Sequence, residues 1–322
     1  MKFRLVKVLM MSSLLVAAHA AVSLAYECIA PANPGGGWDF TCRQVSKVMY
    51  DIGAIDKPIQ VTNMAGAGGG IAYNYVVAER NKDADLIVAA SMATTTRLAQ
   101  NAYAGMTADQ VRFVGALGAD PGIIMVGAKS PFKTLKDFVD AAKKDPQSIS
   151  IAGGSIAGGF DHIKPLMVLQ RGGVEDVTKV RYVAFNGGGE AITQTIGGFT
   201  QAMSGDMSEA VGFIKSGDVR VLAVLTDERV PGFDDIPTAK EQGFDVVAVN
   251  WRGLYVPKGI SDETFQQWAD RLQKVADSDE WKKVMADNGL APFTKVGADF
   301  QNYIDGVTAE VKKISKQLGV IQ

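Results

Sequence analysis

Five short segments carry residues that could bind an anion without any charged side chain. Four are rich in glycine, the fifth is rich in hydroxyl groups, and none contains Lys or Arg. Each segment comes directly after residues that we expect to form a strand and leads into the amino end of a helix. Helix amino ends expose unpaired N–H groups and a positive dipole, and glycine lets an anion approach them. Tight turns use the same glycines, so the predicted anion cleft depends on several loops occurring together. The glycine loops are 33–39, 65–70, 153–159 and 186–190, and the hydroxyl-rich segment is 91–96.

The residues present give little support to enzyme chemistry. Residues 153–157, Gly-Gly-Ser-Ile-Ala, resemble a degenerate nucleophile elbow, so a secreted serine hydrolase using Ser155 is the alternative function. Such a hydrolase needs a histidine well after the serine, but His162 follows Ser155 by only seven residues. The pattern Gly66-x-Gly68 is only a partial dinucleotide fingerprint, and no loop continues as Gly-Lys-Ser/Thr. With two cysteines and two histidines in the chain, we expect no catalytic residue, cofactor or metal.

Alternating strand-like and helix-like runs must position these loops. Ligands of open α/β sheets bind where strand carboxyl ends meet helix amino ends, and this alternation predicts an α/β fold with mostly parallel sheets. The expected strands are 27–32, 58–63, 86–91, 112–117, 122–127, 148–152, 180–185, 219–226 and 246–249. The expected helices are 39–52, 71–80, 135–144, 159–171, 190–196, 207–215, 262–277, 280–288 and 298–318.

The chain length and the lack of a linker favour two lobes joined by two crossings of the chain. The 322 residues exceed an ordinary single domain, and no low-complexity segment divides them. We expect one lobe from 26–124 and 228–322, and a second from 125–227. The net charge of −2 shows no excess of basic residues of the kind that nucleic-acid-binding proteins have. The mean hydropathy of +0.06 excludes a multi-span membrane protein.

Residues 1–25 have the pattern of a secretory signal peptide. Three basic residues precede an apolar stretch at 8–18, and small residues suited to cleavage follow, ending near Ala25. The alternative, a retained membrane anchor, is disfavoured because the apolar stretch is shorter than the ~20 residues of a membrane span. Outside the cytoplasm, Cys28 and Cys42 can form a disulfide, which their close spacing favours. The other possibility is a pair of free, buried thiols.

With these motifs in view, the mature chain resembles the substrate-binding proteins of tripartite tricarboxylate transporters, the Bug or TctC-like family. The opening 27–42, ECIAPANPGGGWDFTC, looks like the tricarboxylate branch and includes both cysteines. Further matches are NMAGAGG at 63–69, FNGGGEA at 185–191 and DIPTAKEQG at 235–243. The resemblance implies a two-lobed periplasmic-binding-protein fold of the Venus flytrap, type II-like class. It also implies a periplasmic receptor that delivers small carboxylates to the membrane subunits of a transporter.

The resemblance also implies a set of ligand-binding residues. In the first lobe these are Gly36, Gly37, Trp38, Asp39, Gly66, Ala67 and Gly68, and the hydroxyl-rich segment adds Ser91 and Thr94. In the second lobe they are Ser155, Gly158, Gly159, Asn186, Gly187 and Asp206. The carboxylates of Asp39 and Asp206 would repel an anion, so helix capping is the alternative role for Asp39. Trp38 would wall the pocket or cover the helix start.

Together these observations predict a monomeric receptor for a di- or tricarboxylate, with a citrate-like ligand expected from the resemblance. The disulfide would tie the first loop to its strand and its helix, and so order the N–H donors in advance. Arg97, Lys164 and Arg252 lie near candidate loops and could supply positive potential, but ordinary solvated charges are the more common outcome for such residues.

Overall fold

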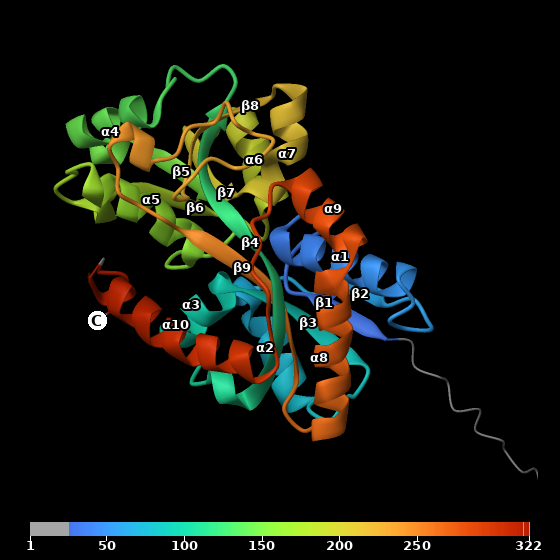
Figure 1. Cartoon of the computed structure of the whole chain (residues 1–322). Coiled ribbons are helices and arrows are strands. Elements are labelled where there is room, and N and C mark those ends of the chain that lie inside the picture. Colours follow the sequence, from blue (N-terminus) through green and yellow to red (C-terminus); the bar gives the residue numbers. More distant parts are fainter. Residues whose placement is uncertain (1–25, 318, 322) are drawn as a thin grey trace, which may run out of the picture.

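The structure is a computed structural model that describes residues 26–317 and 319–321, and it forms two lobes around one mixed sheet (Figure 1). The predicted signal peptide lies outside the described residues. The strands are β1 (Glu27–Ala30), β2 (Gln60–Asn63), β3 (Leu86–Ser91), β4 (Val111–Gly127), β5 (Ser150–Gly153), β6 (Arg181–Ala184), β7 (Ala202–Asp206), β8 (Val219–Val224), β9 (Val249–Pro257) and β10 (Lys295–Val296). The helices are α1 (Gly37–Asp51), α2 (Gly70–Ala78), α3 (Met92–Ala99), α4 (Leu135–Lys144), α5 (Phe160–Arg171), α6 (Gly188–Ile196), α7 (Met207–Ser216), α8 (Asp262–Asp277), α9 (Asp279–Asn288) and α10 (Ala298–Gln317).

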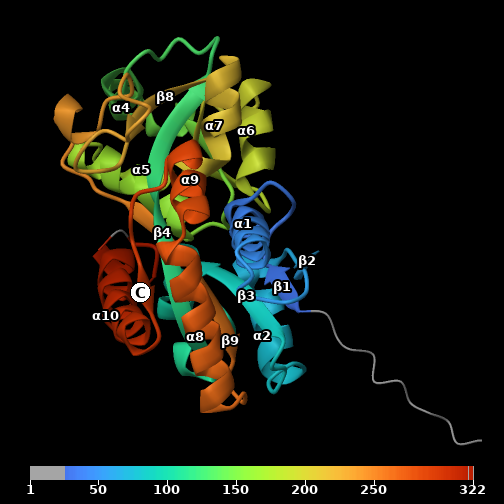
Figure 2. The same ribbon diagram turned by 45° about the vertical axis from the view of Figure 1, so that its right-hand side comes forward.

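Each lobe has its own group of parallel strands. In the first lobe β1 pairs in parallel with β2 and β3, and in the second lobe β5 pairs in parallel with β6 and β7. The long strand β4 pairs antiparallel with β9 and β10 at one end and with β7 and β8 at the other, so it runs through both lobes (Figures 1 and 2). The two-lobed α/β fold is therefore confirmed. The sheet is mixed rather than mostly parallel, because the strands that link the lobes are antiparallel to their neighbours.

Three elements near the cleft differ from the sequence expectation, and the short strand β10 was not expected at all. The two strands expected at 112–117 and 122–127 are one strand, β4, because its backbone stays extended and paired with β9 through Gly118 and Pro121. The strand expected at 246–249 begins only at Val249 and continues to Pro257. The segment 91–96, expected to be a loop, forms most of α3, and the Ser91 hydroxyl accepts a hydrogen bond from the Ala93 N–H at the start of that helix.

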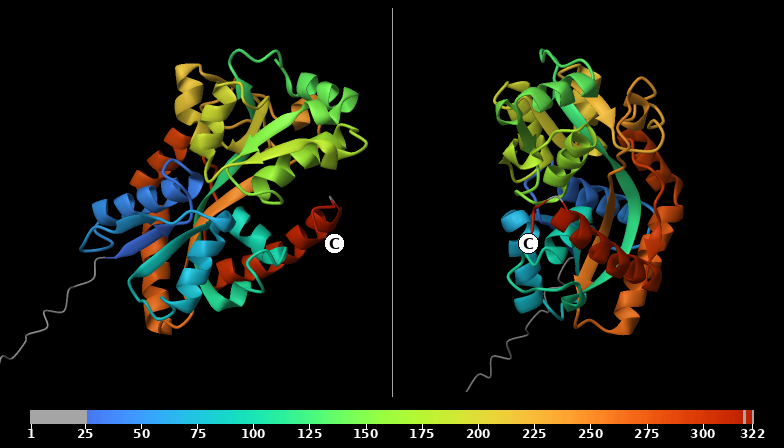
Figure 3. Two further views of the ribbon diagram at one scale, coloured as in Figure 1. Left: turned by 180° about the vertical axis from the view of Figure 1, so that it is seen from behind. Right: turned by 90° about the vertical axis from the view of Figure 1, so that its left-hand side faces the viewer.

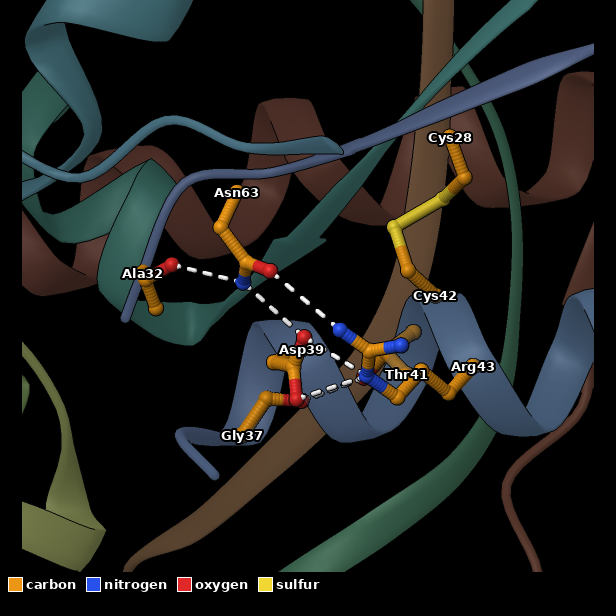
Figure 4. The surroundings of a disulfide bond; sticks show 8 residues. All are labelled: Cys28, Ala32, Gly37, Asp39, Thr41, Cys42, Arg43 and Asn63. Atoms are coloured by element: carbon orange, nitrogen blue, oxygen red, sulfur yellow. Dashed lines mark hydrogen bonds and ion pairs between the residues drawn. A yellow bond between two sulfur atoms is a disulfide. The ribbon is translucent and has the colours of Figure 1, made fainter. Parts of the chain in front are cut away.

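Helix α1 is fixed to the first lobe by its apolar face and by a disulfide. Cys42, Val45 and Met49 are buried, and their spacing places them on one side of the helix, toward β1 and β3. Burial of each such aliphatic side chain contributes about 1.5–3 kcal/mol. The predicted Cys28–Cys42 bond joins β1 to α1, with 5.7 Å between the two Cα atoms (Figure 4). The loop that opens α1 is thus held at both of its ends.

The C-terminal helices cover the first lobe and reach the second. Helix α8 packs against β4 and α1, and α10 packs against α3 and β4. Figure 3 shows α10 extending from the first lobe toward α5. No helix among residues 26–317 is both long enough and apolar enough to span a bilayer.

Candidate ligand-binding cleft

The loops that open α1 and α6 meet across the interface between the lobes. The Asn33 N–H donates to the carbonyl oxygen of Asn186 at 3.0 Å. A Cβ placed on Gly36 would lie 3.3 Å from the Cα of Gly187, so the two backbones touch where both loops have glycine. The structure therefore brings together two of the glycine loops, one from each lobe, that the sequence analysis singled out.

Two small cavities lie between the lobes at these loops, with volumes of about 20 and 40 Å³. A cavity of this size holds one or two water molecules. A citrate-sized molecule therefore does not fit between the lobes as they are arranged here. The 20 Å³ cavity is lined by Pro31, Trp38, Gly66, Gly68, Ala93, Arg97, Gly154, Ser155, Ile156, Gly159, Phe185 and Asn186. The 40 Å³ cavity is lined by Ala32, Gly37, Trp38, Ser91, Ala93, Gly154, Ser155, Asp161, Gly187, Asp206, Glu209, Asn250 and Arg252.

Most of the predicted ligand-binding residues line one of these cavities, although their contact with a ligand stays a prediction. The residues that do so are Gly37, Trp38, Gly66, Gly68, Ser91, Ser155, Gly159, Asn186, Gly187 and Asp206. Five predicted residues line neither cavity: Gly36, Asp39, Ala67, Thr94 and Gly158. Gly158 instead lines a larger outer groove beside Arg97, Gln100 and His162.

The amino end of α1 binds a carboxylate oxygen in the described state. The Gly37 N–H donates to Oε1 of Glu209 at 2.7 Å, and Glu209 belongs to α7 in the second lobe. The next two amides of α1, those of Trp38 and Asp39, make no hydrogen bond with any described residue. The Gly37 amide is therefore occupied by the carboxyl group of Glu209, and the amides of Trp38 and Asp39 have no partner among the described residues.

A buried network of charged side chains forms the floor of the 40 Å³ cavity. Arg252 of β9 donates through Nη2 to Asp120 of β4 and to Asp206 at the start of α7, both at 2.8 Å. The Lys164 ammonium on α5 donates to Asp206 at 2.6 Å and pairs with Asp161 at 2.9 Å. These pairs link both lobes through the strands β4 and β9 that connect them.

Lys164 and Arg252 are therefore not solvated surface charges. Their side chains are 0% and 4% exposed, respectively. Arg252 is buried because β9 continues through the position that the sequence analysis left outside a strand. Lys164 is buried because it lies one turn beyond Asp161 on the face of α5 that meets Asp206. Buried cations of this kind persist only when they are paired, and each has two carboxylate partners here.

Glu209 lies beside this network without a cationic partner of its own among the described residues. Burial, together with the nearby Asp206 carboxylate, raises the pKa of Glu209 to about 8. Burial would also raise the pKa of Asp206, but Lys164 and Arg252 outweigh it and hold that pKa below its usual value. Glu209 is accordingly protonated at neutral pH, when Asp206 is ionised.

Asp39 and Asp206 have different roles. The Asp39 carboxylate accepts hydrogen bonds from the Asn63 amide at 2.9 Å and from Nε of Arg43 at 2.9 Å (Figure 4). It also accepts the Gly35 N–H at 3.0 Å. Asp39 lines neither cavity, so its carboxylate stabilises the conformation of the first loop through these hydrogen bonds. Asp206 precedes α7 as its N-cap residue and also lines the 40 Å³ cavity.

Trp38 and Ser91 form one wall of the cleft. The indole Nε1 of Trp38 donates to the Ser91 hydroxyl at 3.1 Å, and Trp38 lines both cavities. The Thr94 hydroxyl accepts the Ser91 N–H at 3.3 Å, which places Thr94 inside α3 rather than at the cleft surface. Of the two predicted hydroxyls, only that of Ser91 belongs to a cavity-lining residue.

A family model described as tripartite tricarboxylate transporter family receptor matches residues 41–320. The chain belongs to this receptor family. Protein BugT of Bordetella pertussis is 24% identical to it over 270 residues, which cover 83% of this chain and 80% of BugT. The solved periplasmic binding protein BugD has the same fold, with a TM-score of 0.82, 22% identity and coverage of 92% of this chain and 98% of BugD. MatC of Rhodopseudomonas palustris, solved with bound malate, has a TM-score of 0.76, 21% identity and coverage of 91% and 97%.

Membership of a receptor family agrees with the geometry around Ser155, whose hydroxyl makes a 3.4 Å hydrogen bond with the Tyr182 hydroxyl and none with His162 among the described residues. The Ser155 hydroxyl accepts the Asp161 N–H at 3.1 Å. Nδ1 of His162 accepts the Gly158 N–H at 2.9 Å, and its ring packs on Tyr182 with 4.4 Å between centroids. Burial lowers the pKa of His162 to about 4. His162 is thus a packing residue of the outer groove.

Sequence reasoning missed three polar residues that line the 40 Å³ cavity, Asp161, Glu209 and Asn250, and it also missed Asp120, which pairs with the cavity-lining Arg252. The spacing Asp206-x-x-Glu209 is that of a capping box, and it could have indicated both acids at the start of one helix. No local signal pairs Asp120 with Arg252, because they meet only through the antiparallel register of β4 and β9.

Proposed function

We propose that this protein is a periplasmic receptor that captures a small di- or tricarboxylate between its lobes and delivers it, as a monomer, to the membrane subunits of a tripartite tricarboxylate transporter. Citrate is the first candidate ligand, on the resemblance of the opening segment to the tricarboxylate branch. The observation that carries the proposal is the 2.7 Å hydrogen bond between the Gly37 N–H and the Glu209 carboxyl group. It places a carboxyl oxygen as hydrogen-bond acceptor on a helix amino end inside the cleft, and a ligand carboxylate would use the same N–H donors.

Capture follows from the position of these two groups in different lobes. Separation of the lobes pulls Glu209 away from Gly37 and leaves three amides, those of Gly37, Trp38 and Asp39, free to bind a ligand carboxylate. Each hydrogen bond to a charged group contributes about 1.5–3 kcal/mol net. Four or five such bonds supply the ~8 kcal/mol of a micromolar complex.

Closure then returns Glu209 to the bound carboxylate. Because its pKa is raised to about 8, Glu209 is a neutral hydrogen-bond donor near neutral pH and does not repel the anion. The Arg252 guanidinium group lies next to the same amides, since a Cβ on Gly37 would overlap it, but Asp120 and Asp206 already balance its charge. Recognition by neutral N–H and O–H donors would bind a carboxylate and still allow its release to the transporter.

Two solved proteins with the same fold support this assignment. MatC was solved with malate, a dicarboxylate, and shares the fold over most of both chains. BugD is a periplasmic binding protein, in keeping with the export signal expected at residues 1–25 here.

Titration calorimetry tests the proposal. The chain without residues 1–25 would be titrated with citrate, tricarballylate, malate, succinate and benzoate. We expect saturable heat with at least one di- or tricarboxylate and none with benzoate. Absence of binding to every di- and tricarboxylate, from a preparation shown to be folded, would refute the proposal.

A further inference from the structure

Arg97 is a partly buried cation at the cleft that has no acidic partner among the described residues. It lies in the last turn of α3 in the first lobe. Its Nη1 donates to Oε1 of Gln100 at 2.9 Å and to the carbonyl oxygen of Ala157, across the interface, at 3.3 Å. Its Nε is buried and makes no hydrogen bond. One edge of the guanidinium group is thus held in place, and the Nε donor is unused.

This arrangement is costly unless an anion completes it. Removal of a charged group from water is unfavourable, and buried cations are normally paired with a carboxylate. Burial lowers the pKa of Arg97, and no acidic side chain opposes that effect. Lys164 and Arg252, which are fully buried near the cleft, each have two acidic partners, whereas Arg97 is only partly buried. Arg97 differs from them in that its counter-charge is not supplied by the described chain.

Arg97 and the Gly37 amide belong to different cavities of the cleft. Arg97 lines the 20 Å³ cavity, whereas Gly37 and Glu209 line the 40 Å³ cavity. The two cavities share four lining residues, Trp38, Ala93, Gly154 and Ser155, so they are neighbouring parts of one cleft. Arg97 also lines the outer groove, together with Gln100, Ala157 and His162.

We propose that Arg97 is the subsite for the second acid group of the ligand, so that the cleft selects molecules with two separated carboxylates over those with one. This inference rests on the proposed function and deepens it. The first carboxylate binds the amides at the start of α1, and the second pairs with the Arg97 guanidinium group between α3 and the loop at 153–159. The planar guanidinium group of an arginine suits a carboxylate, which can accept two parallel hydrogen bonds from it, and separation of the lobes would be needed to expose Nε.

The test uses pairs of ligands that differ only in the second acid group: succinate with butyrate, and adipate with hexanoate. Calorimetry would compare wild type, Arg97→Gln, Arg97→Lys and a control, Arg171→Gln, which removes an exposed positive charge at the end of α5. We expect Arg97→Gln to weaken the better-bound diacid about 10- to 100-fold and to change its monoacid partner less than about twofold. Arg97→Lys should retain part of the diacid preference because it keeps the charge, and Arg171→Gln should match wild type.

Other outcomes separate the inference from the proposed function. If Arg97→Gln weakens diacid and monoacid binding equally, then Arg97 acts only through its contact with Ala157 between the lobes, and the inference is overturned. Unchanged diacid binding in both Arg97 variants would overturn it as well. If wild-type protein binds none of the diacids in either experiment, the proposed function fails and the inference fails with it. Thermal melting of each variant confirms folding, and Arg97→Lys remains informative if Arg97→Gln does not fold.

Discussion

Replacement of Glu209 by glutamine should make the protein more stable at alkaline pH and should remove part of its pH dependence. Glutamine has the shape of a protonated glutamate, and its amide oxygen can still accept the Gly37 N–H. In the wild-type protein, the pKa of Glu209 is raised from 4.5 to about 8 by burial and by the Asp206 carboxylate. The folded state therefore retains a proton between these pH values that the unfolded chain has lost.

The sign and size of the effect follow from this proton. Between pH 4.5 and 8 the folded state binds one more proton at Glu209, so the free energy of unfolding falls by about 1.4 kcal/mol per pH unit from this group. Above pH 8 the contribution is flat. Neighbouring acids can share the proton, so we expect about 2 kcal/mol of relative stabilisation of Glu209→Gln between pH 5.5 and 7.5.

Urea denaturation of both proteins at pH 5.5, 6.5, 7.5 and 8.5 measures this difference. The control is Glu175→Gln, which neutralises an exposed glutamate in a loop of the second lobe and should follow the wild-type pH dependence. Parallel pH dependences for wild type and Glu209→Gln would contradict the reasoning, because they would show that Glu209 ionises in the folded protein as readily as in the unfolded chain.

Three further substitutions test other parts of the site. Replacing both Cys28 and Cys42 by serine should lower the free energy of unfolding by about 3 kcal/mol and weaken citrate binding, because the disulfide closes a loop of about 15 residues that carries the α1 amides. Unchanged citrate affinity in calorimetry would refute the idea that the disulfide orders these amides. Gly37→Ala should weaken citrate binding more than tenfold, since its methyl group would overlap the Arg252 guanidinium, whereas Gly212→Ala, which has open space in α7, should bind citrate normally. Arg252→Met should destabilise the protein by about 3–5 kcal/mol in urea, because it leaves Asp120 and Asp206 without their shared partner; a loss below 1 kcal/mol would show that this pairing adds little.

The two-lobed architecture was predictable because local patterns encode most of it. Glycine loops between apolar runs marked the strand–helix junctions, and the opening segment 27–42 carried the family resemblance. The disulfide was predictable from compartment and spacing, and the structure contains it. The residue boundaries of the lobes stay a prediction. Strand β4 crosses between the lobes without a break, so no local signal marks a boundary within it.

The polar floor of the cleft was not predictable in the same way. Arg252 and Asn250 lie on a strand whose sequence alternates poorly, and their partners Asp120 and Asp206 are far away in the chain. Only the pairing of β4 with β9 and with β7 brings these groups together. Lys164 looked like an ordinary helix-surface charge, since nothing near it in sequence indicates that Asp206 lies against that face of α5.

A crystal structure of the mature protein with citrate, or with whichever carboxylate binds most tightly, tests the central claim most directly. We expect a ligand carboxylate oxygen about 3 Å from the amide nitrogen atoms of Gly37 and Trp38, in the place that Oε1 of Glu209 occupies in the described state. A ligand bound elsewhere, with the hydrogen bond between Gly37 and Glu209 intact, would contradict the account.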